Sequence, residues 1–140
     1  MRFDWQQYLQ LAKSLRVEGS VTPYDEAKLR SAISRAYYAA HCSAADFMHR
    51  RGWQFPRRNR RPRGDTRGSH EVLHDEMAKL SDPNGYLVAQ KLRDMKLRRV
   101  NADYFGDYDR SVNDLNKILI AAQDNVSLSE QVIQLIKGLR

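Results

Sequence analysis

The residue types best suited to chemistry in this chain are arginines that are followed, a few positions later, by a histidine. The pairing occurs three times, from Arg35 to His41, from Arg63 to His70 and from Arg67 to His74. A histidine titrates near neutral pH and can act as a general base or acid, and an arginine can neutralise the charge that develops on a phosphoryl group. These are residue types that acid–base cleavage of a phosphodiester can use. Three occurrences in 140 residues show that the bare spacing is a weak signal.

The first pair lies in a segment with helical periodicity, and helix geometry separates its two side chains. Six residues at about 100° each place His41 about 240° from Arg35. The two could share a site only across a dimer or through a break in the helix. Otherwise we expect His41 to pack against Tyr37 or Tyr38, one turn earlier.

A second group of titratable residues stands at the expected start of a later helix. His70 and His74 are one turn apart there, with Glu71 beside them. A metal ion would need further ligands, for which Asp75 and Glu76 are only weak candidates. We therefore expect no metal and no cofactor. For His70 we expect a place in a polar helix cap, with a role in an active site as the alternative.

The positive charge of the chain is concentrated in one segment. The net charge is +7, from 24 basic and 17 acidic residues. Residues 50–67 contain eight arginines and one acid, Asp65, so the remainder of the chain holds 16 of each sign. The segment could bind RNA phosphates through Arg57, Arg58, Arg60, Arg61 and Arg63, with Trp53 and Phe55 as faces for base stacking. It could also bind an acidic protein, or be a solvated loop; the use of arginine without lysine favours phosphate.

Apolar residues recur at helical spacing along most of the chain, and no segment shows the alternation of a strand. We expect helices at about residues 4–17, 24–50, 69–80, 86–99 and 109–139, with an Arg-rich loop at 50–68 and turns at 82–85 and 102–109. The predicted fold class is all-α, a single domain (residues 1–140) built as an antiparallel bundle of four to five helices. The single cysteine excludes an internal disulfide, and the N-terminus has no signal-peptide core, so we expect a cytoplasmic protein with no membrane span.

Two short blocks carry a resemblance to a known family. The chain reads Ser-Arg-Ala-Tyr-Tyr-Ala-Ala-His at 34–41 and Arg-Val-Asn-Ala-Asp-Tyr at 99–104, with a Ser-His-Glu-Val-Leu segment at 69–73 between them. In this order the blocks resemble small stand-alone HEPN proteins of bacteria and archaea, over nearly the whole chain. The resemblance implies a helical bundle that forms a homodimer and acts on RNA or nucleotides. Its ribonuclease members are metal-independent and belong to toxin–antitoxin, CRISPR or phage-defence systems.

The resemblance also points to specific residues. In the family's ribonucleases four to six residues separate an arginine from a following histidine; the matching arginine here is Arg99, and after four intervening residues the chain has Tyr104 instead. Tyrosine titrates near pH 10 and is a poor base at neutral pH, although it could hold a phosphate or orient a water molecule. The candidate catalytic residues are therefore Arg35, His41, His70, Arg99 and Tyr104. Asp103 is expected to pair with Arg35 or Arg99.

Two functions remain open from the sequence. The first is an RNA- or nucleotide-binding protein that acts as a metal-independent endoribonuclease toxin. The second is a non-catalytic helical module that binds a nucleotidyltransferase-like protein or an antitoxin.

Overall fold

The computed structural model describes residues 3–15, 22–104 and 112–139, without the side chains of residues 23, 58, 104 and 112–114. This part of the chain contains five α-helices: α1 (Gln6–Ser14), α2 (Glu26–Arg50), α3 (Ser69–Ala78), α4 (Pro83–Tyr104) and α5 (Val112–Gly138). Short 3₁₀ turns lie at Pro23–Asp25 and Arg58–Arg60, and the described residues form no β-strand. The prediction of an all-α bundle of four to five helices is confirmed.

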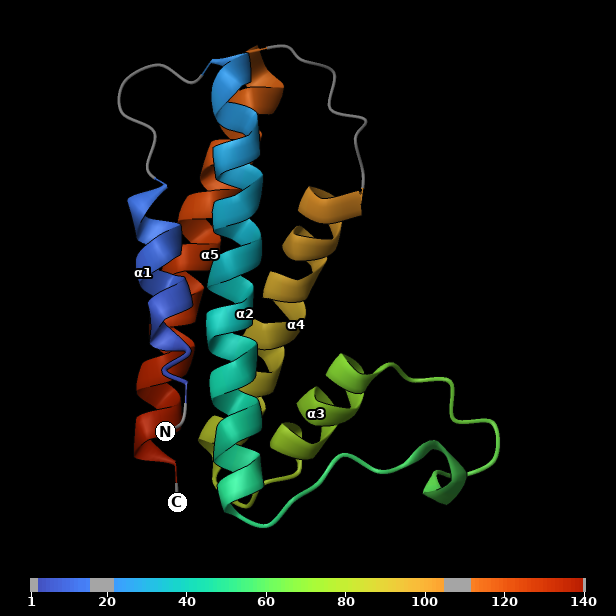
Figure 1. Cartoon of the computed structure of the whole chain (residues 1–140). Helices are drawn as coiled ribbons and strands as arrows, with labels where there is room; N and C mark the ends of the chain where they lie inside the picture. Colours follow the sequence, from blue (N-terminus) through green and yellow to red (C-terminus); the bar gives the residue numbers. More distant parts are fainter. Residues whose placement is uncertain (1–2, 16–21, 105–111, 140) are drawn as a thin grey trace.

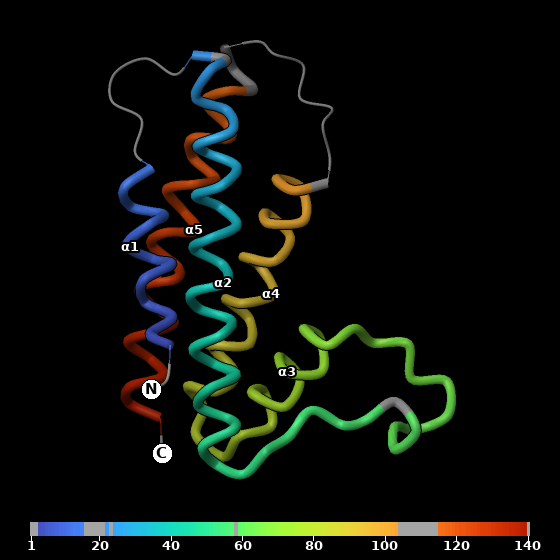
Figure 2. The backbone as a smooth tube through the Cα atoms, in the orientation of Figure 1, coloured from blue at the N-terminus to red at the C-terminus, as the bar shows by residue number. Residues whose placement is uncertain are grey.

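Helix α2 is the central element of the bundle. It packs against α1, α4 and α5, and α3 lies mainly on α4. Helices α1, α2, α4 and α5 run alternately up and down along a common axis, so α2 and α5 are parallel (Figure 1). The short helix α3 and the loop before it extend to one side of this axis (Figure 2). Small residues allow neighbours on several sides of α2, because Ala32, Ala36, Ala39, Ala40 and Ala44 are all buried.

The expected turn at Asp82–Gly85 is wrong, because α4 begins at Pro83 and includes Asn84 and Gly85. Proline suits the first turn of a helix, where its missing N–H has no partner to lose. The carboxylate of Asp82 accepts a hydrogen bond from the Asn84 backbone N–H at 3.0 Å and so caps this end. Gly85 is required by the close approach of α3: a Cβ at this position would lie 2.5 Å from the Met77 carbonyl oxygen.

The other helix ends follow local sequence. Helix α2 begins at Glu26 after the 3₁₀ turn, and not at Tyr24 as expected. It ends before Gly52, whose positive φ of 87° is favourable only for glycine. The turn expected at 102–109 is wrong for its first residues, because α4 continues as far as Tyr104. The other residues of that expected turn, and the expected start of the last helix at 109, lie outside the described residues.

A buried amide joins three helices in the middle of the bundle. Asn125 on α5 is fully buried, and its Nδ2 donates to the carbonyl oxygens of Ile33 at 3.2 Å and Met95 at 3.3 Å. A buried amide that bonds to two other helices fixes the position of α5 along the axis. Within the described residues, no helix combines the length and the apolar character that a membrane span requires.

Candidate functional site

Three histidines and one tyrosine converge where α3 crosses α2. The Tyr37 hydroxyl lies 2.6 Å from His70 Nδ1. The same hydroxyl lies 3.3 Å from His41 Nδ1 and 3.4 Å from His74 Nε2. His41 Nδ1 and His74 Nε2 are themselves 3.3 Å apart. One phenol oxygen therefore connects three imidazole rings, and we call these four residues the histidine–tyrosine cluster.

Helix periodicity explains why each helix contributes two members. Tyr37 and His41 are one turn apart on α2, and His70 and His74 are one turn apart on α3, so each pair faces the other helix. The imidazoles of His41 and His70 stack with ring centroids 4.0 Å apart and an angle of 10° between their planes. His74 and Tyr37 are fully buried beneath them.

The cluster is largely buried, and burial disfavours the charged forms of its histidines. Burial lowers the pKa of His41 to about 2, and the neighbouring histidines add to the effect. Burial also lowers the pKa of His74 to about 3, and that of the half-buried His70 falls below its ordinary value. The same loss of hydration raises the pKa of Tyr37, which stays a neutral phenol. Neutral imidazoles are the form that can accept a proton.

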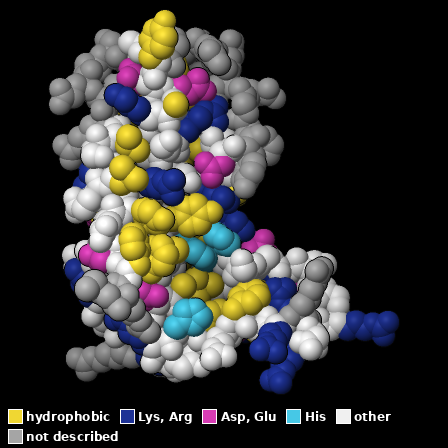
Figure 3. All heavy atoms as spheres, viewed as in Figure 1, with side chains coloured by type: hydrophobic (Ala, Val, Ile, Leu, Met, Phe, Trp, Pro, Cys, Tyr) yellow, Lys and Arg dark blue, Asp and Glu magenta, His cyan; other side chains and the backbone are white. Residues whose placement is uncertain are grey.

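The stacked histidines each have one nitrogen available for a ligand. Their Nδ1 atoms contact the Tyr37 hydroxyl, so the Nε2 atoms on the other side of each ring are directed away from it. Neither Nε2 has a hydrogen-bond partner among the described residues. Histidine side chains reach the surface on the face that carries the projecting loop, with basic and apolar side chains around them (Figure 3).

Two cations from α4 act on the cluster. The charges of Lys96 and Arg99 both lower the pKa of His41 and His70, so both lie close to the rings. Lys96 pairs loosely with Glu71, at 3.8 Å. Lys96 and Arg99 thus form a basic edge beside the stacked imidazoles.

Arg99 is held by residues of both family-like blocks. Its Nη2 donates to the Tyr38 hydroxyl at 2.7 Å, and its guanidinium lies over the Tyr38 ring, 5.1 Å from the centroid. Its Nε lies 2.9 Å from the Asp103 carboxylate, which also accepts a 3.3 Å hydrogen bond from Ser34. The expected pairing of Asp103 is thus with Arg99. These contacts explain structurally why the blocks at 34–41 and 99–104 occur together.

The structure does not bring Arg35 to the cluster. Its guanidinium lies 5.2 Å from the centre of the Tyr8 ring, on the α1 side of α2, while His41 faces α3. The two side chains thus point to different faces, as the 240° separation indicates. The side chain of Tyr104, a further catalytic candidate, lies outside the described residues.

The arginine-rich loop (residues 50–68) is attached to α3 by its own arginines. Arg67 pairs with Asp65 at 2.9 Å and with Asp75 on α3 at 2.7 Å, and Asp75 also pairs with Arg93 of α4. Arg61 donates to the Arg67 carbonyl oxygen through both terminal nitrogens, at 2.8 and 2.9 Å. Arg61, one of the expected RNA ligands, therefore has a structural task.

The remaining expected RNA ligands differ in exposure. Arg57, Arg60 and Arg63 are exposed, whereas the side chain of Arg58 lies outside the described residues. Trp53 is half-buried and packs against the core, which leaves less of its ring for a base than sequence alone suggests.

Sequence reasoning did not predict that Tyr37 and His74 belong to the candidate site. The sequence predicts Tyr37 as a packing partner of His41, and it places His74 in the Arg67–His74 pair and beside His70 in a weak metal-site pattern, although the spacing of one turn in each helix is visible. No pattern in the sequence indicates that Lys96 lies beside the site. Across the described residues, no group of three or more His, Cys, Asp or Glu side chains is arranged to hold a metal ion.

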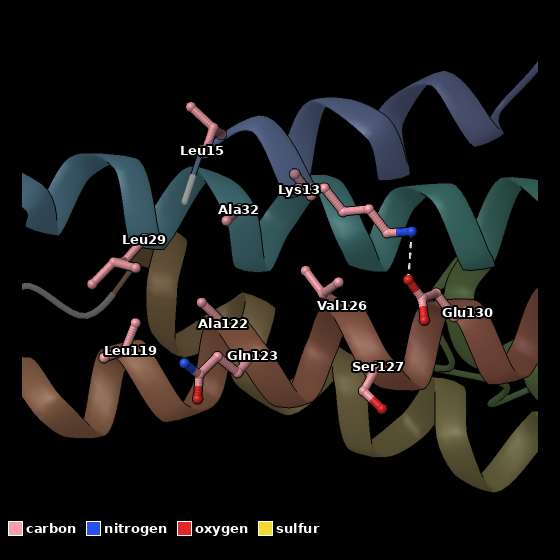
Figure 4. Close-up of a pocket in the computed structure, with 11 residues that line it drawn as sticks. Lys13, Leu15, Leu29, Ala32, Leu119, Ala122, Gln123, Val126, Ser127 and Glu130 are labelled. Atoms are coloured by element: carbon pink, nitrogen blue, oxygen red, sulfur yellow. Dashed lines mark ion pairs between the residues drawn. The ribbon is translucent and has the colours of Figure 1, made fainter. Parts of the chain in front are cut away.

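A separate apolar groove lies between α1, α2 and α5, away from the histidines. Its volume is about 480 Å³, and Leu15, Leu29, Leu119 and Val126 line it, with the Lys13–Glu130 ion pair at one end (Figure 4). It contains no titratable group positioned for acid–base chemistry apart from that pair. The histidine–tyrosine cluster is the better candidate for a reaction site.

Comparison of the chain with protein-family models, with curated proteins and with solved structures finds no match.

Proposed function

We propose that this chain is a HEPN-like, RNA-binding protein that cleaves RNA without a metal ion at the histidine–tyrosine cluster. The observation that carries the proposal is the stacked pair of neutral imidazoles, His41 and His70, which share the hydroxyl of Tyr37 and lie beside Lys96 and Arg99. A metal-independent ribonuclease needs a base, an acid and a cation within one site, and this site holds all three types.

The cluster allows an assignment of protons that separates base from acid. Tyr37 donates its proton to His41 Nδ1, and His70 Nδ1–H donates to the Tyr37 oxygen. His70 Nε2 then carries a lone pair and serves as the base, while His41 Nε2–H serves as the acid. Both reactive nitrogens face away from Tyr37, where a ligand can approach.

The reaction balances through the tyrosine. His70 Nε2 takes the proton of the ribose 2′-hydroxyl, and the 2′-oxygen bonds to phosphorus. His70 passes its Nδ1 proton to Tyr37, which passes its own proton to His41 Nδ1. His41 gives its Nε2 proton to the 5′-oxygen as the P–O5′ bond breaks, which leaves a 2′,3′-cyclic phosphate and a 5′-hydroxyl.

The basic groups divide into two tasks. Lys96 and Arg99 stabilise the negative charge of the phosphorane beside the imidazoles. The exposed arginines Arg57, Arg60 and Arg63 hold the RNA strand through its phosphates. A protein of this kind suits the toxin of a toxin–antitoxin or phage-defence pair in the cytoplasm, with a second copy of the chain or an antitoxin as partner.

The test is cleavage of end-labelled RNA in excess EDTA. We expect cleavage with 2′,3′-cyclic phosphate ends, and no cleavage at a linkage that carries 2′-deoxyribose. His70→Gln and Tyr37→Phe should each lower the rate by about 10²- to 10⁴-fold, the range typical of a lost acid or base. His49→Gln is the matched control, because His49 is an exposed histidine on α2 outside the cluster.

The proposal fails if the RNA stays intact, if the deoxy linkage is cut equally well, or if His49→Gln is as damaging as His70→Gln. Intact RNA would favour the non-catalytic alternative, in which the chain binds a nucleotidyltransferase-like protein or an antitoxin.

A further inference from the structure

The ring of Phe55 on the arginine-rich loop borders two small hollows. One, of about 300 Å³, has Arg61, Asp65 and Arg67 in its wall. The other, of about 320 Å³, is lined by Gln54, Phe55, Pro56, Arg57 and Arg60. Both volumes lie at the lower end of the range of about 300–1,000 Å³ that is usual for small-ligand sites.

The arginines that line the first hollow bind other residues of the protein and so stabilise the loop. The Arg61 guanidinium lies over the Phe55 ring, 5.1 Å from its centroid, while its terminal nitrogens hold the Arg67 carbonyl oxygen. Arg67 in turn holds Asp65 and reaches Asp75 on α3. This chain of contacts fixes one side of the Phe55 ring and sets the ring in place.

The second hollow, which we call the Phe55 hollow, has the composition of a nucleotide site. Phe55 is 39 % exposed, although a phenylalanine ordinarily gains free energy by burial. Arg57 and Arg60 are exposed, and their side chains make no ion pair with another described residue. Gln54 adds an amide that can both donate and accept hydrogen bonds. An aromatic face, two available guanidinium groups and an amide thus border one space.

We propose that the Phe55 hollow binds one unpaired nucleotide of a single-stranded RNA. The base stacks on the Phe55 ring, Gln54 bonds to its edge, and Arg57 and Arg60 hold the flanking phosphates. A base within a duplex cannot present its face to a side chain, so the site selects single strands. This inference rests on the proposed function for the identity of the ligand as RNA, but not on cleavage.

RNA fits this surface better than an acidic protein does. Carboxylates would pair with Arg57 and Arg60 but would leave the Phe55 ring exposed. A nucleotide covers the ring and both guanidinium groups at once. The planar base and the phosphate oxygens match the planar ring and the forked guanidinium groups.

The test is fluorescence anisotropy with a labelled 12-nucleotide RNA, measured as a single strand and as a duplex over a range of salt concentrations, with the full chain in EDTA. A 2′-O-methyl strand prevents cleavage. We expect the single strand to bind at least tenfold more tightly than the duplex. Phe55→Leu, which keeps an apolar side chain but removes the aromatic face, should weaken single-strand binding about 5- to 100-fold with an unchanged salt slope. Arg57→Gln and Arg60→Gln should each weaken binding and reduce that slope by about one.

The matched control is Phe3→Leu. Phe3 is 47 % exposed and belongs to an aromatic group with Trp5 and Tyr8 beside α1, so RNA affinity should not change. Circular dichroism of Phe55→Leu checks that the helices persist.

Equal binding of strand and duplex, with no effect of Phe55→Leu, would overturn the inference and identify a general polyanion surface. Displacement of the single strand by equimolar polyglutamate would overturn it in favour of an acidic protein partner. Cleavage that survives while Phe55→Leu has no effect on binding would leave the proposed function standing without this site. Tight, Phe55-dependent binding without cleavage would support the Phe55 hollow as an RNA site and overturn the proposed ribonuclease activity.

Discussion

Lowering the pH from 7 to 5 should destabilise this protein through its buried histidines. His41 and His74 have pKa values of about 2 and about 3 in the folded state, because burial disfavours their charged forms. In the unfolded chain each titrates near 6.5. For a histidine with a depressed pKa, the stabilisation is complete above the unfolded pKa. It is lost as the pH falls through 6.5 towards the folded pKa, because the unfolded state binds the proton first.

The size of the effect depends little on the folded values. At pH 7 and at pH 5 both histidines stay neutral in the folded protein, so only the unfolded chain takes up protons in this interval. Integrating that uptake with a pKa near 6.5 gives about 1.9 kcal/mol for each residue, or roughly 4 kcal/mol for the pair. His70 adds a contribution of the same sign, since its pKa is also lowered. The total is a large fraction of the roughly 5–15 kcal/mol that stabilises a typical domain.

Carboxylates contribute mainly at lower pH. The pKa of Asp65 falls below its ordinary value because Arg67 donates hydrogen bonds to it, and the pKa of Asp75 is lowered by Arg67 and then Arg93. Their stabilisation is present above the unfolded pKa near 3.9 and is lost as the pH falls below it. The interval from pH 7 to pH 5 therefore isolates the histidines.

The assay is urea unfolding followed by circular dichroism at 222 nm, at pH 7 and at pH 5. The free energy of unfolding should fall by about 4 kcal/mol with an unchanged m-value. A double variant, His41→Gln with His74→Gln, should lose most of this pH dependence whatever its own stability, whereas His49→Gln should keep it. A fall of less than 1 kcal/mol in the wild-type protein, or an equal loss of pH dependence in His49→Gln, would refute the description of His41 and His74 as buried and neutral.

Four further variants, with Gly138→Ala as a control, test individual contacts of the structure. Tyr37→Phe should lower the free energy of unfolding by about 1–3 kcal/mol in urea titrations, because it leaves buried imidazole nitrogens without their hydroxyl partner. Asn125→Ala should cost a similar amount by the same assay, since it removes both bonds to neighbouring helices. Gly85→Ala should also destabilise the chain by about 1–3 kcal/mol, because its Cβ meets the backbone of α3, and Gly138→Ala, where nothing lies within 4 Å, should not. Arg67→Ala should modestly lower the free energy of unfolding in urea titrations, because its ion pairs with Asp65 and Asp75 are only partly exposed, and it should speed tryptic cleavage of the arginine-rich loop at its other arginines.

Local pattern predicted the elements well where one physical rule dominates. The stripe on α2 was readable because its apolar residues repeat every three or four positions, and Ser69 was placed correctly as the start of α3. The turn expected at Asp82–Gly85 failed because Asp, Pro, Asn and Gly are typical of turns and also of a capped helix start. Only the close packing of α3 on Gly85 decides between them, and that packing is a tertiary contact.

The candidate site shows a similar division. His41, His70 and Arg99 were identified from residue type and from the family-like blocks. The sequence could not predict how these side chains are arranged, because their arrangement depends on how α3 crosses α2. Tyr37 was assigned to packing because a tyrosine in the middle of an apolar stripe ordinarily belongs to the core. It is indeed fully buried, and yet its hydroxyl joins the three histidines.

Tyr104 stands where the family that the sequence resembles has a histidine after the arginine. In the ribonucleases of that family the arginine and the histidine come from one short segment, whereas here the imidazoles come from α2 and α3 and the arginine from α4. Arg99 lies over Tyr38, the residue that follows Tyr37, and its charge acts on both stacked histidines. A cation and two neutral imidazoles can therefore meet at one place without the expected motif. If cleavage follows this geometry, it should depend on His70 and His41 and tolerate a change at Tyr104. Tyr104→Phe, assayed with labelled RNA in EDTA, should retain cleavage within about threefold of the wild-type rate, and a loss as deep as that of His70→Gln would return the active site to the Arg99–Tyr104 segment.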